Sequence, residues 1–156
     1  MAITQTATSS FKAELFLGVH DFRVAGDVFK LALYTAAAVI DANTTGYTAT
    51  GEVVGAGYIA GGGTLVNQGV TTVNATTSTG GGFTDFADLT FPNATITARG
   101  ALIYNSTPSG ANNAGAALVN PTVAVLDFGA EKTSTTGDFT IIFPTPAPTT
   151  AIIRIS

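Results

Sequence analysis

Few residues in this chain have side chains suited to catalysis. His20 is the only histidine and cysteine is absent, so disulfides, thiolate metal sites and Cys nucleophiles are excluded. A Ser-His-Asp triad would have to use His20, and although Asp21 and Asp27 are near it in sequence, no nucleophile-elbow motif accompanies them. One histidine also gives too few ligands for a zinc site. His20 is therefore predicted to be a surface or capping residue.

Two carboxylates in FTDFADLTF, Asp85 and Asp88, are the candidates for paired acid-base chemistry such as glycoside hydrolysis. Residues three apart on a strand point to opposite faces, so these two could not converge on one bond. Asp85 with carbonyls of NATTSTGGGFTD could hold Ca²⁺, but no EF-hand spacing supports it. GAGYIAGGG lacks the Lys-Ser/Thr of a phosphate-binding loop, so its glycines are predicted to be structural. We expect no enzyme, no cofactor and no metal site.

The composition predicts a charge-poor surface that is covered by other chains. Only 10% of the 156 residues are charged, against about 25% in ordinary soluble domains. The mean hydropathy is +0.38, yet LALYTAAAVI ends at Asp41, well short of a membrane-spanning helix. MAITQTATSS lacks the features of a signal peptide, and six scattered Lys and Arg residues form no basic stripe for nucleic acid. We therefore expect neither membrane nor nucleic acid as a partner.

The N-terminal part is predicted to be a flexible arm over residues 1–10, followed by a short helix. Ser9 or Ser10 is the expected N-cap, and Gly18 lies near the end of the helix. The alternation of apolar residues would also suit a strand, but Lys12, Ala13, Glu14 and Leu15 favour helix. The apolar stripe of the helix consists of Phe11, Leu15, Val19 and Phe22.

The rest of the chain reads as short strands with turns between them. AAAVIDANTTGYTAT and STPSGANNAGAA are expected to be loops, and Pro92-Asn93 a turn. Strands at such short intervals, with little helix, predict one mainly β domain over residues 11–156, an antiparallel β-sandwich or jelly-roll-like fold. The expected strands are GDVFKLALYT, GEVVGAGYIAGGGTLV, GVTTVNATTST, FTDFADLTF, ATITARGALIYN, TVAVLDFG, DFTIIFP and AIIRIS.

Arg99 lies in the middle of one of the best strands, ATITARGALIYN. Alternation puts Arg99 on a polar face, opposite a core face made of Ile96, Ala98, Gly100, Leu102 and Tyr104. Its expected partner is Asp127 on a neighbouring strand, with Asp88 as the alternative. The pair is either solvated or buried between subunits, where bidentate geometry would fix the register. The sequence leaves both open.

Three blocks carry a resemblance to known proteins: ALYT…Y…TGEV.G.GY..GG, F.D…F.NATITARGALIYN and LDFG..K….GDFTI.FP. Together, from about Ser10 to the end of the chain, they resemble a family of small structural proteins of tailed bacteriophages. The resemblance implies a virion component assembled in the host cytoplasm and transfers no catalytic residue. Size and composition point to a capsid decoration, or cement, protein.

Such a protein would bind copies of itself, expected to be a trimer, and the major capsid protein. Phe11, Leu15, Arg99 and Asp127 are the candidate contact residues. The alternative is a tail or head-fibre component whose loops STPSGANNAGAA and AAVIDANTTG bind the host surface, although the absence of tryptophan argues against glycan binding. A hydrolase using Asp85 or Asp88 is the third and weakest hypothesis.

Overall fold

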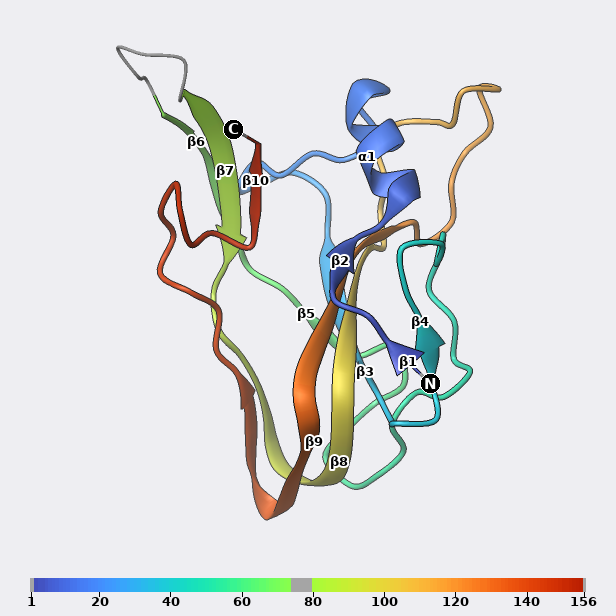
Figure 1. Ribbon diagram of the computed structural model, residues 1–156, viewed down its shortest axis with the longest axis vertical. Coiled ribbons are helices and arrows are strands. Elements are labelled where there is room, and N and C mark those ends of the chain that lie inside the picture. The colour runs from blue at the N-terminus through green and yellow to red at the C-terminus, as the bar shows by residue number, and fades with distance from the viewer. Residues whose placement is uncertain (1, 74–79, 156) are drawn as a thin grey trace.

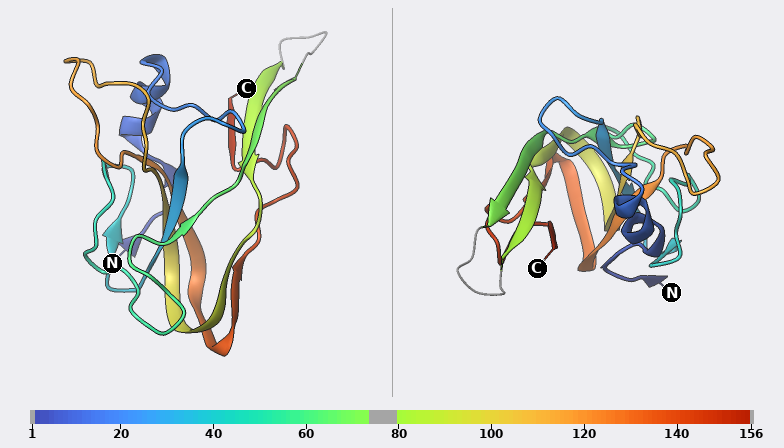
Figure 2. Two further views of the ribbon diagram at one scale, coloured as in Figure 1. Left: turned by 180° about the vertical axis from the view of Figure 1, so that it is seen from behind. Right: turned by 90° about the horizontal axis from the view of Figure 1, so that it is seen from above.

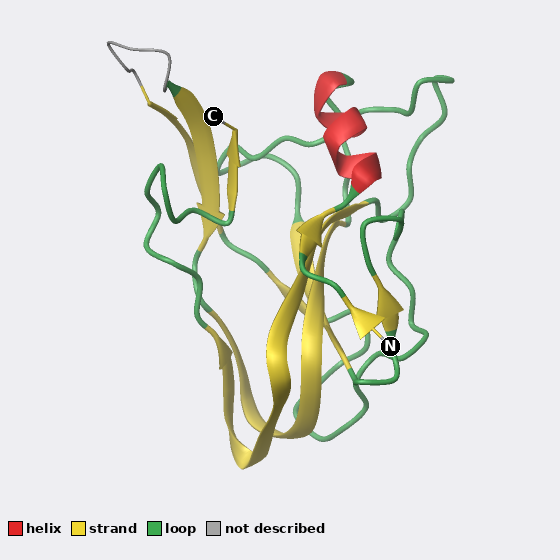
Figure 3. Ribbon diagram, in the orientation of Figure 1, coloured by secondary structure: helices red, strands yellow, loops and turns green. Residues whose placement is uncertain are grey.

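The computed structural model describes residues 2–73 and 80–155 and confirms a mainly β fold (Figure 1). Within these residues the only helix is α1, Ser9–Phe16 (Figure 3), and it is not long enough to cross a membrane. The strands are β1 (Ala2–Ile3), β2 (Thr6–Ala7), β3 (Phe29–Tyr34), β4 (Val39–Ile40), β5 (Gly63–Thr64), β6 (Asn67–Val73), β7 (Gly81–Phe86), β8 (Leu89–Asn105), β9 (Thr122–Ile141) and β10 (Ile153–Ile155).

Two antiparallel sheets form a sandwich-like domain. The larger has the order β2-β9-β8-β3-β5 and the smaller the order β10-β7-β6, while β1 and β4 form a separate parallel pair. Side chains from both sheets, including Leu31 and Phe86, belong to one inner core. Seen from above in Figure 2, the chain forms an incomplete ring that is open between the C-terminal strand and α1. The predicted sandwich is therefore present, with one side open.

The two strands of the β8–β9 hairpin are the longest in the described residues, and the hairpin bends from the larger sheet toward the smaller one. The sequence predicted a turn at Pro92-Asn93, but β8 runs through these residues and bends there instead. Opposite the bend, β9 is equally continuous, so TVAVLDFG and the first four residues of DFTIIFP belong to one strand, which ends at Ile141. Asn93 (φ 51°) and Thr136 (φ 50°) adopt left-handed conformations at this bend, and the lower end of both strands turns upward in Figure 1. Bulges in the pairing accommodate the bend.

The central part of the larger sheet is buried on both faces. On β3, Leu31 and Leu33 point to the inner core, whereas Ala32 and Tyr34 belong to a second, outer cluster. The outer cluster is covered by β1, β4 and the segment that follows β4, which includes Tyr47. Its buried members are Ile3, Ala32, Tyr34, Ala38, Ile40, Leu102, Tyr104 and Val125. A strand with apolar residues at both parities is typical of a sheet covered on both sides.

Residues 2–8 lie on the domain, which corrects the expectation of a flexible arm. β1 pairs with β4, β2 pairs with β9, and Ile3 is buried in the outer cluster. A Cβ at position 100 would come within 2.8 Å of Ile3 Cγ2, so Gly100 makes room for this docking. Thr8, rather than Ser9 or Ser10, is the N-cap: its Oγ1 accepts a hydrogen bond from Phe11 N and its N donates to Val123 O.

The glycine-rich segment 51–62 was predicted to be an interrupted strand and is instead a loop that packs on the sheet. Its glycines are structural, as predicted, because they allow a close approach: a Cβ on Gly62, which has φ +74°, would lie 1.8 Å from Leu31 O. Only the end of the predicted segment, Gly63–Thr64, forms a strand, and it pairs with β3. The backbone of the loop therefore touches β3 where no side chain fits.

Glu52 holds this loop in place from inside. Its carboxylate accepts hydrogen bonds from the hydroxyls of Tyr47 and Tyr58, both 2.6 Å, and from Gly61 N, 2.7 Å. Tyr104 Oη donates to Gly61 O at 2.7 Å, and Tyr34 Oη donates to Thr48 O at 2.5 Å. All of the chain's tyrosines thus gather at this carboxylate, and burial raises the pKa of each of them.

Glu52→Ala should destabilise the fold strongly, because one buried and two half-buried donors lose their acceptor at about 1–3 kcal/mol each. We expect a loss of roughly 3 kcal/mol or more in the free energy of unfolding, measured by urea denaturation. Glu131→Ala, at an exposed carboxylate on β9, is the control and should lie within about 0.5 kcal/mol of the parent protein. Equal stability of the two variants would contradict the role of Glu52.

Candidate functional site

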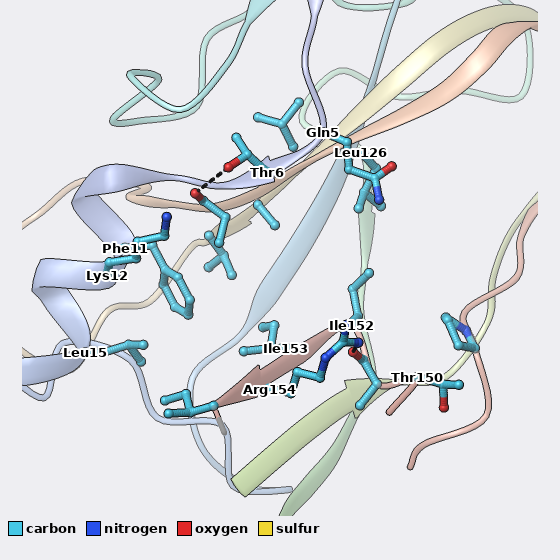
Figure 4. Close-up of a pocket in the computed structure, with 17 residues that line it drawn as sticks. Gln5, Thr6, Phe11, Lys12, Leu15, Leu126, Thr150, Ile152, Ile153 and Arg154 are labelled. Atoms are coloured by element: carbon cyan, nitrogen blue, oxygen red, sulfur yellow. Dashed lines mark hydrogen bonds between the residues drawn. The ribbon is translucent and has the colours of Figure 1, made fainter. Parts of the chain in front are cut away.

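A groove of about 570 Å³ opens where the sandwich is incomplete. One wall is α1 with β2, the edge strand of the larger sheet, and the other is β10, the edge strand of the smaller sheet. On the opposite side the chain runs from β5 through Leu65 straight into β6, so the two sheets are joined there. The groove is therefore a gap between two free sheet edges (Figure 4).

The inside of the groove is apolar and continuous with the inner core. Phe11 and Leu15 project from α1 toward Ile153 of β10 (Figure 4). Phe11 is only 2% exposed, whereas Leu15 and Ile153 are half-buried and pack against the core. The floor comes from β9, and the far end from the segment that precedes β10. The other apolar residues that line it are Ala7, Val123, Ala124, Val125, Leu126, Pro144, Ala151, Ile152 and Ile155, of which Val125 contributes its backbone because its side chain lies in the outer cluster.

The charges at the groove are both positive. Of the described residues that line it, only Lys12 and Arg154 carry a charge, and both are exposed. Arg154 Nη1 donates to the backbone oxygen of Ala151 at 3.3 Å. Neither cation forms an ion pair with a described residue. The ion pairs among the described residues involve other side chains. In a chain with ten acidic and six basic residues, this is a local reversal of the overall charge.

The structure divides the four predicted contact residues. Phe11 and Leu15 both line the groove, whereas Arg99 and Asp127 do not. Phe11 is so deeply buried that its first role is in the core, where Phe→Ala typically costs about 3–5 kcal/mol. Sequence reasoning missed β10 and Arg154 as the opposite wall, because no local pattern in AIIRIS indicates which segment it faces.

Arg99 and Asp127 form the expected ion pair across β8 and β9, and Asp88 is not involved. A second contact joins Arg99 Nη2 to Asp127 Oδ2 at 3.5 Å, and each side chain is 26% exposed. The pair lies at a bulge, where residues 128–131 of β9 stand opposite Arg99 alone. Asp127 Oδ1 also accepts a hydrogen bond from Gly129 N at 2.8 Å, and Gly129 has φ +74°.

The bulge changes which side of β8 faces the inner core, and this corrects the predicted core face. Ala94, Ile96 and Ala98 point to the inner core before the bulge, but Ala101 and Ile103 do so after it. Leu102 and Tyr104, assigned to the same face as Ile96, lie in the outer cluster. Strict alternation fails here because extra residues on β9 shift the pairing at Arg99. The ion pair therefore marks the bulge, and its predicted role in assembly remains a prediction.

Arg99→Ala should cost less stability than Asp127→Ala. A partly exposed ion pair contributes about 0–1 kcal/mol, but Asp127 also accepts the Gly129 hydrogen bond inside the bulge. We expect Asp127→Ala to be less stable than Arg99→Ala by about 0.5–1.5 kcal/mol in urea denaturation at low salt. Greater destabilisation by Arg99→Ala would show that the cation has a further partner.

His20 was predicted to be a surface or capping residue, and the structure instead buries its side chain, which is 0% exposed. Its ring lies among Phe11, Phe22 and Phe29, with centroids 5.2, 6.1 and 6.3 Å away. Nε2 is 2.8 Å from Glu14 Oε2, and Nδ1 is 3.1 Å from Asn105 Nδ2. A single polar residue between aromatic residues gives no sequence signal that separates a buried from an exposed histidine.

The contacts of His20 fit the neutral ring. Nε2–H donates to Glu14, and Nδ1 accepts from the amide of Asn105, which also donates to Asp27 Oδ2 at 2.7 Å. A second proton would face the Asn105 donor. Burial lowers the pKa of His20, outweighing the hydrogen bond with Glu14 and the charges of Glu14 and Asp27, which raise it. The network ties α1 to the end of β8 and so positions one wall of the groove.

The stability should fall as the pH drops below about 6.5, because the unfolded chain then binds a proton that the folded chain resists. The neutral His20 contributes fully to the free energy of unfolding above that pH. As the pH falls from about 6.5 toward the lower pKa of His20 in the folded chain, this contribution is lost by up to about 1.4 kcal/mol per pH unit. His20→Gln should be less stable at pH 7 but should decline less steeply on acidification. Parallel stability curves for the two proteins between about pH 7 and 5 would contradict this assignment.

Asp85 and Asp88 anchor the other wall. Asp85 is buried on β7, whereas Asp88 is exposed in the connection between β7 and β8, so the two do not share the single strand that the sequence predicted. Asp85 Oδ2 accepts from Ile152 N at 3.3 Å, and Asp88 Oδ1 accepts from Phe143 N at 2.9 Å. Burial raises the pKa of Asp85. Most of the segment proposed to accompany Asp85 in binding Ca²⁺, residues 74–79, lies outside the described residues. The two carboxylates hold the segment that leads to β10.

A scan against protein-family models, a search of curated proteins and a search of solved structures each found no match for this chain.

Proposed function

We propose that the chain is a non-enzymatic structural protein of a tailed-phage virion, which binds the head shell as an oligomer and stabilises it. The proposal rests on the three sequence blocks that resemble small phage structural proteins and on the surface of the fold. A decoration protein needs a rigid domain with apolar surface that its own copies and the capsid can cover.

The observation that carries the proposal is the exposure of large apolar side chains on a charge-poor surface. Phe16 is 93% exposed and Val54 95% exposed, although only 10% of all residues are charged. Single exposed apolar residues are ordinary, but their frequency here favours burial in an assembly. Further exposed large apolar residues are Val24, Val39, Ile59, Val66, Val70, Val119, Ile142 and Ile155.

The buried carboxylates support a structural rather than a catalytic role. Glu52 binds two tyrosine hydroxyls, Asp85 binds backbone amides, and Glu14 binds His20. Each of these groups has its hydrogen-bonding capacity directed to the fold, and none of them lines the groove. They position elements of the domain and face no common cavity.

Labelled antibody against the chain should decorate the heads of virions of the phage that encodes it, as seen by electron microscopy. Purified protein should form an oligomer, expected to be a trimer, in size-exclusion chromatography with light scattering at micromolar concentration. The head shells of particles that lack the chain should be disrupted at a lower temperature than those of complete particles.

The locations distinguish the candidate roles. Label on tails or fibres would replace the decoration proposal by the alternative of host binding. Absence of the chain from purified particles, together with a stable monomer in solution, would overturn both. A virion that lacks only this chain and is equally heat-resistant would overturn the stabilising role.

A further inference from the structure

We infer that the groove between α1 and β10 binds an extended, acidic segment of a partner protein, which adds a strand at the free edge of β10. This inference rests on the proposed function, because it names the chemistry by which a virion protein would hold a neighbouring protein. It concerns a single surface, whose walls, floor and charges each restrict the ligand.

The walls favour a peptide backbone. In the part of the chain that the structure describes, β10 pairs with β7 along one edge and has no strand along the other. β2 is likewise the outermost strand of the larger sheet. Backbone N–H and C=O groups at an unpaired edge bind an added strand through the ladder that they would form inside a sheet. A gap with such an edge on each side is the place where this sandwich can be completed.

The floor favours apolar side chains at alternate positions. Leu15 and Ile153 are half-buried and Ile155 is 62% exposed, so each has apolar area left to cover. Successive side chains of an added strand point alternately toward the floor and toward solvent. The inward set would contact the apolar lining, and the outward set would lie at the rim beside the exposed Lys12 and Arg154.

The charges favour carboxylates and disfavour a second copy. Both charged lining residues are cations that have no ion-pair partner among the described residues. Two copies that paired their β10 edges about a twofold axis would bring two Arg154 side chains to one interface, where they repel each other. An acidic segment of another protein avoids this repulsion and gives both cations an ion-pair partner. The occupant is therefore a partner's strand with apolar and acidic residues in alternation.

The test uses the ¹⁵N-labelled full chain and two end-blocked synthetic peptides, one alternating valine with glutamate and one alternating valine with lysine. The glutamate peptide should shift the amide resonances of β10 and β2 and should bind at least about tenfold more tightly than the lysine peptide. Arg154→Glu should abolish or reverse this preference. Lys132→Glu makes the same charge change at an exposed residue of β9 outside the groove and should preserve it.

Several results would overturn the inference. They are equal affinity for the two peptides, no binding of the glutamate peptide up to about 1 mM, shifts confined to residues outside the groove, or an unchanged preference in Arg154→Glu. Sedimentation that shows the glutamate peptide displacing a second copy from the groove would assign it to self-association instead. If the peptides fail while antibody still labels the heads, only this inference is wrong; if the heads are unlabelled, the proposed function is wrong.

Discussion

The fold depends on one constraint: the β8–β9 hairpin is apolar on both faces over residues 101–104 and 123–126, and this part must be covered on both. Leu102 and Val125 face the outer cluster, whereas Ile103 and Val123 face the inner core. A two-sided apolar hairpin has no stable place at a surface, because each exposed large side chain forgoes about 1.5–3 kcal/mol of burial. The smaller sheet covers one face, and the N-terminal strands with the glycine-rich loop cover the other. The layered shape of the domain follows from this requirement.

Buried polar groups attach these covering layers to the hairpin. Glu52 ties the glycine-rich loop together through Tyr47 and Tyr58, and Tyr104 on β8 anchors that loop to the sheet. His20 connects α1 to Asn105 at the end of β8. Asp85 connects β7 to the segment before β10. A buried carboxylate or imidazole ring without a hydrogen-bond partner would lower the stability of the fold. These hydrogen bonds therefore fix the position of each covering layer relative to the hairpin.

The same arrangement explains why the domain has one open side. The chain passes directly between the sheets at β5 and β6, and the bent hairpin joins them at its lower end, but β2 and β10 come from opposite ends of the sequence. No covalent connection draws these two strands together, and Phe11 and Ile153 line the space between them. A chain with little charge to protect a free edge leaves it available for pairing with another strand. The proposed assembly function and the groove are thus consequences of one topology.

The sequence by itself determined the class of fold and favoured Asp127 over Asp88 as the partner of Arg99, because these depend on local periodicity and on the charge of neighbouring strands. It could not determine that β8 continues through Pro92-Asn93, that Ile3 docks beside Gly100, or that His20 is buried. Those outcomes depend on contacts between residues far apart in the chain: a bulge that shifts the pairing, a glycine that admits a distant side chain, and a pocket of phenylalanine rings assembled from α1, β3 and the segment between them. The groove belongs to this second group, since its two walls meet only after the sheets have folded.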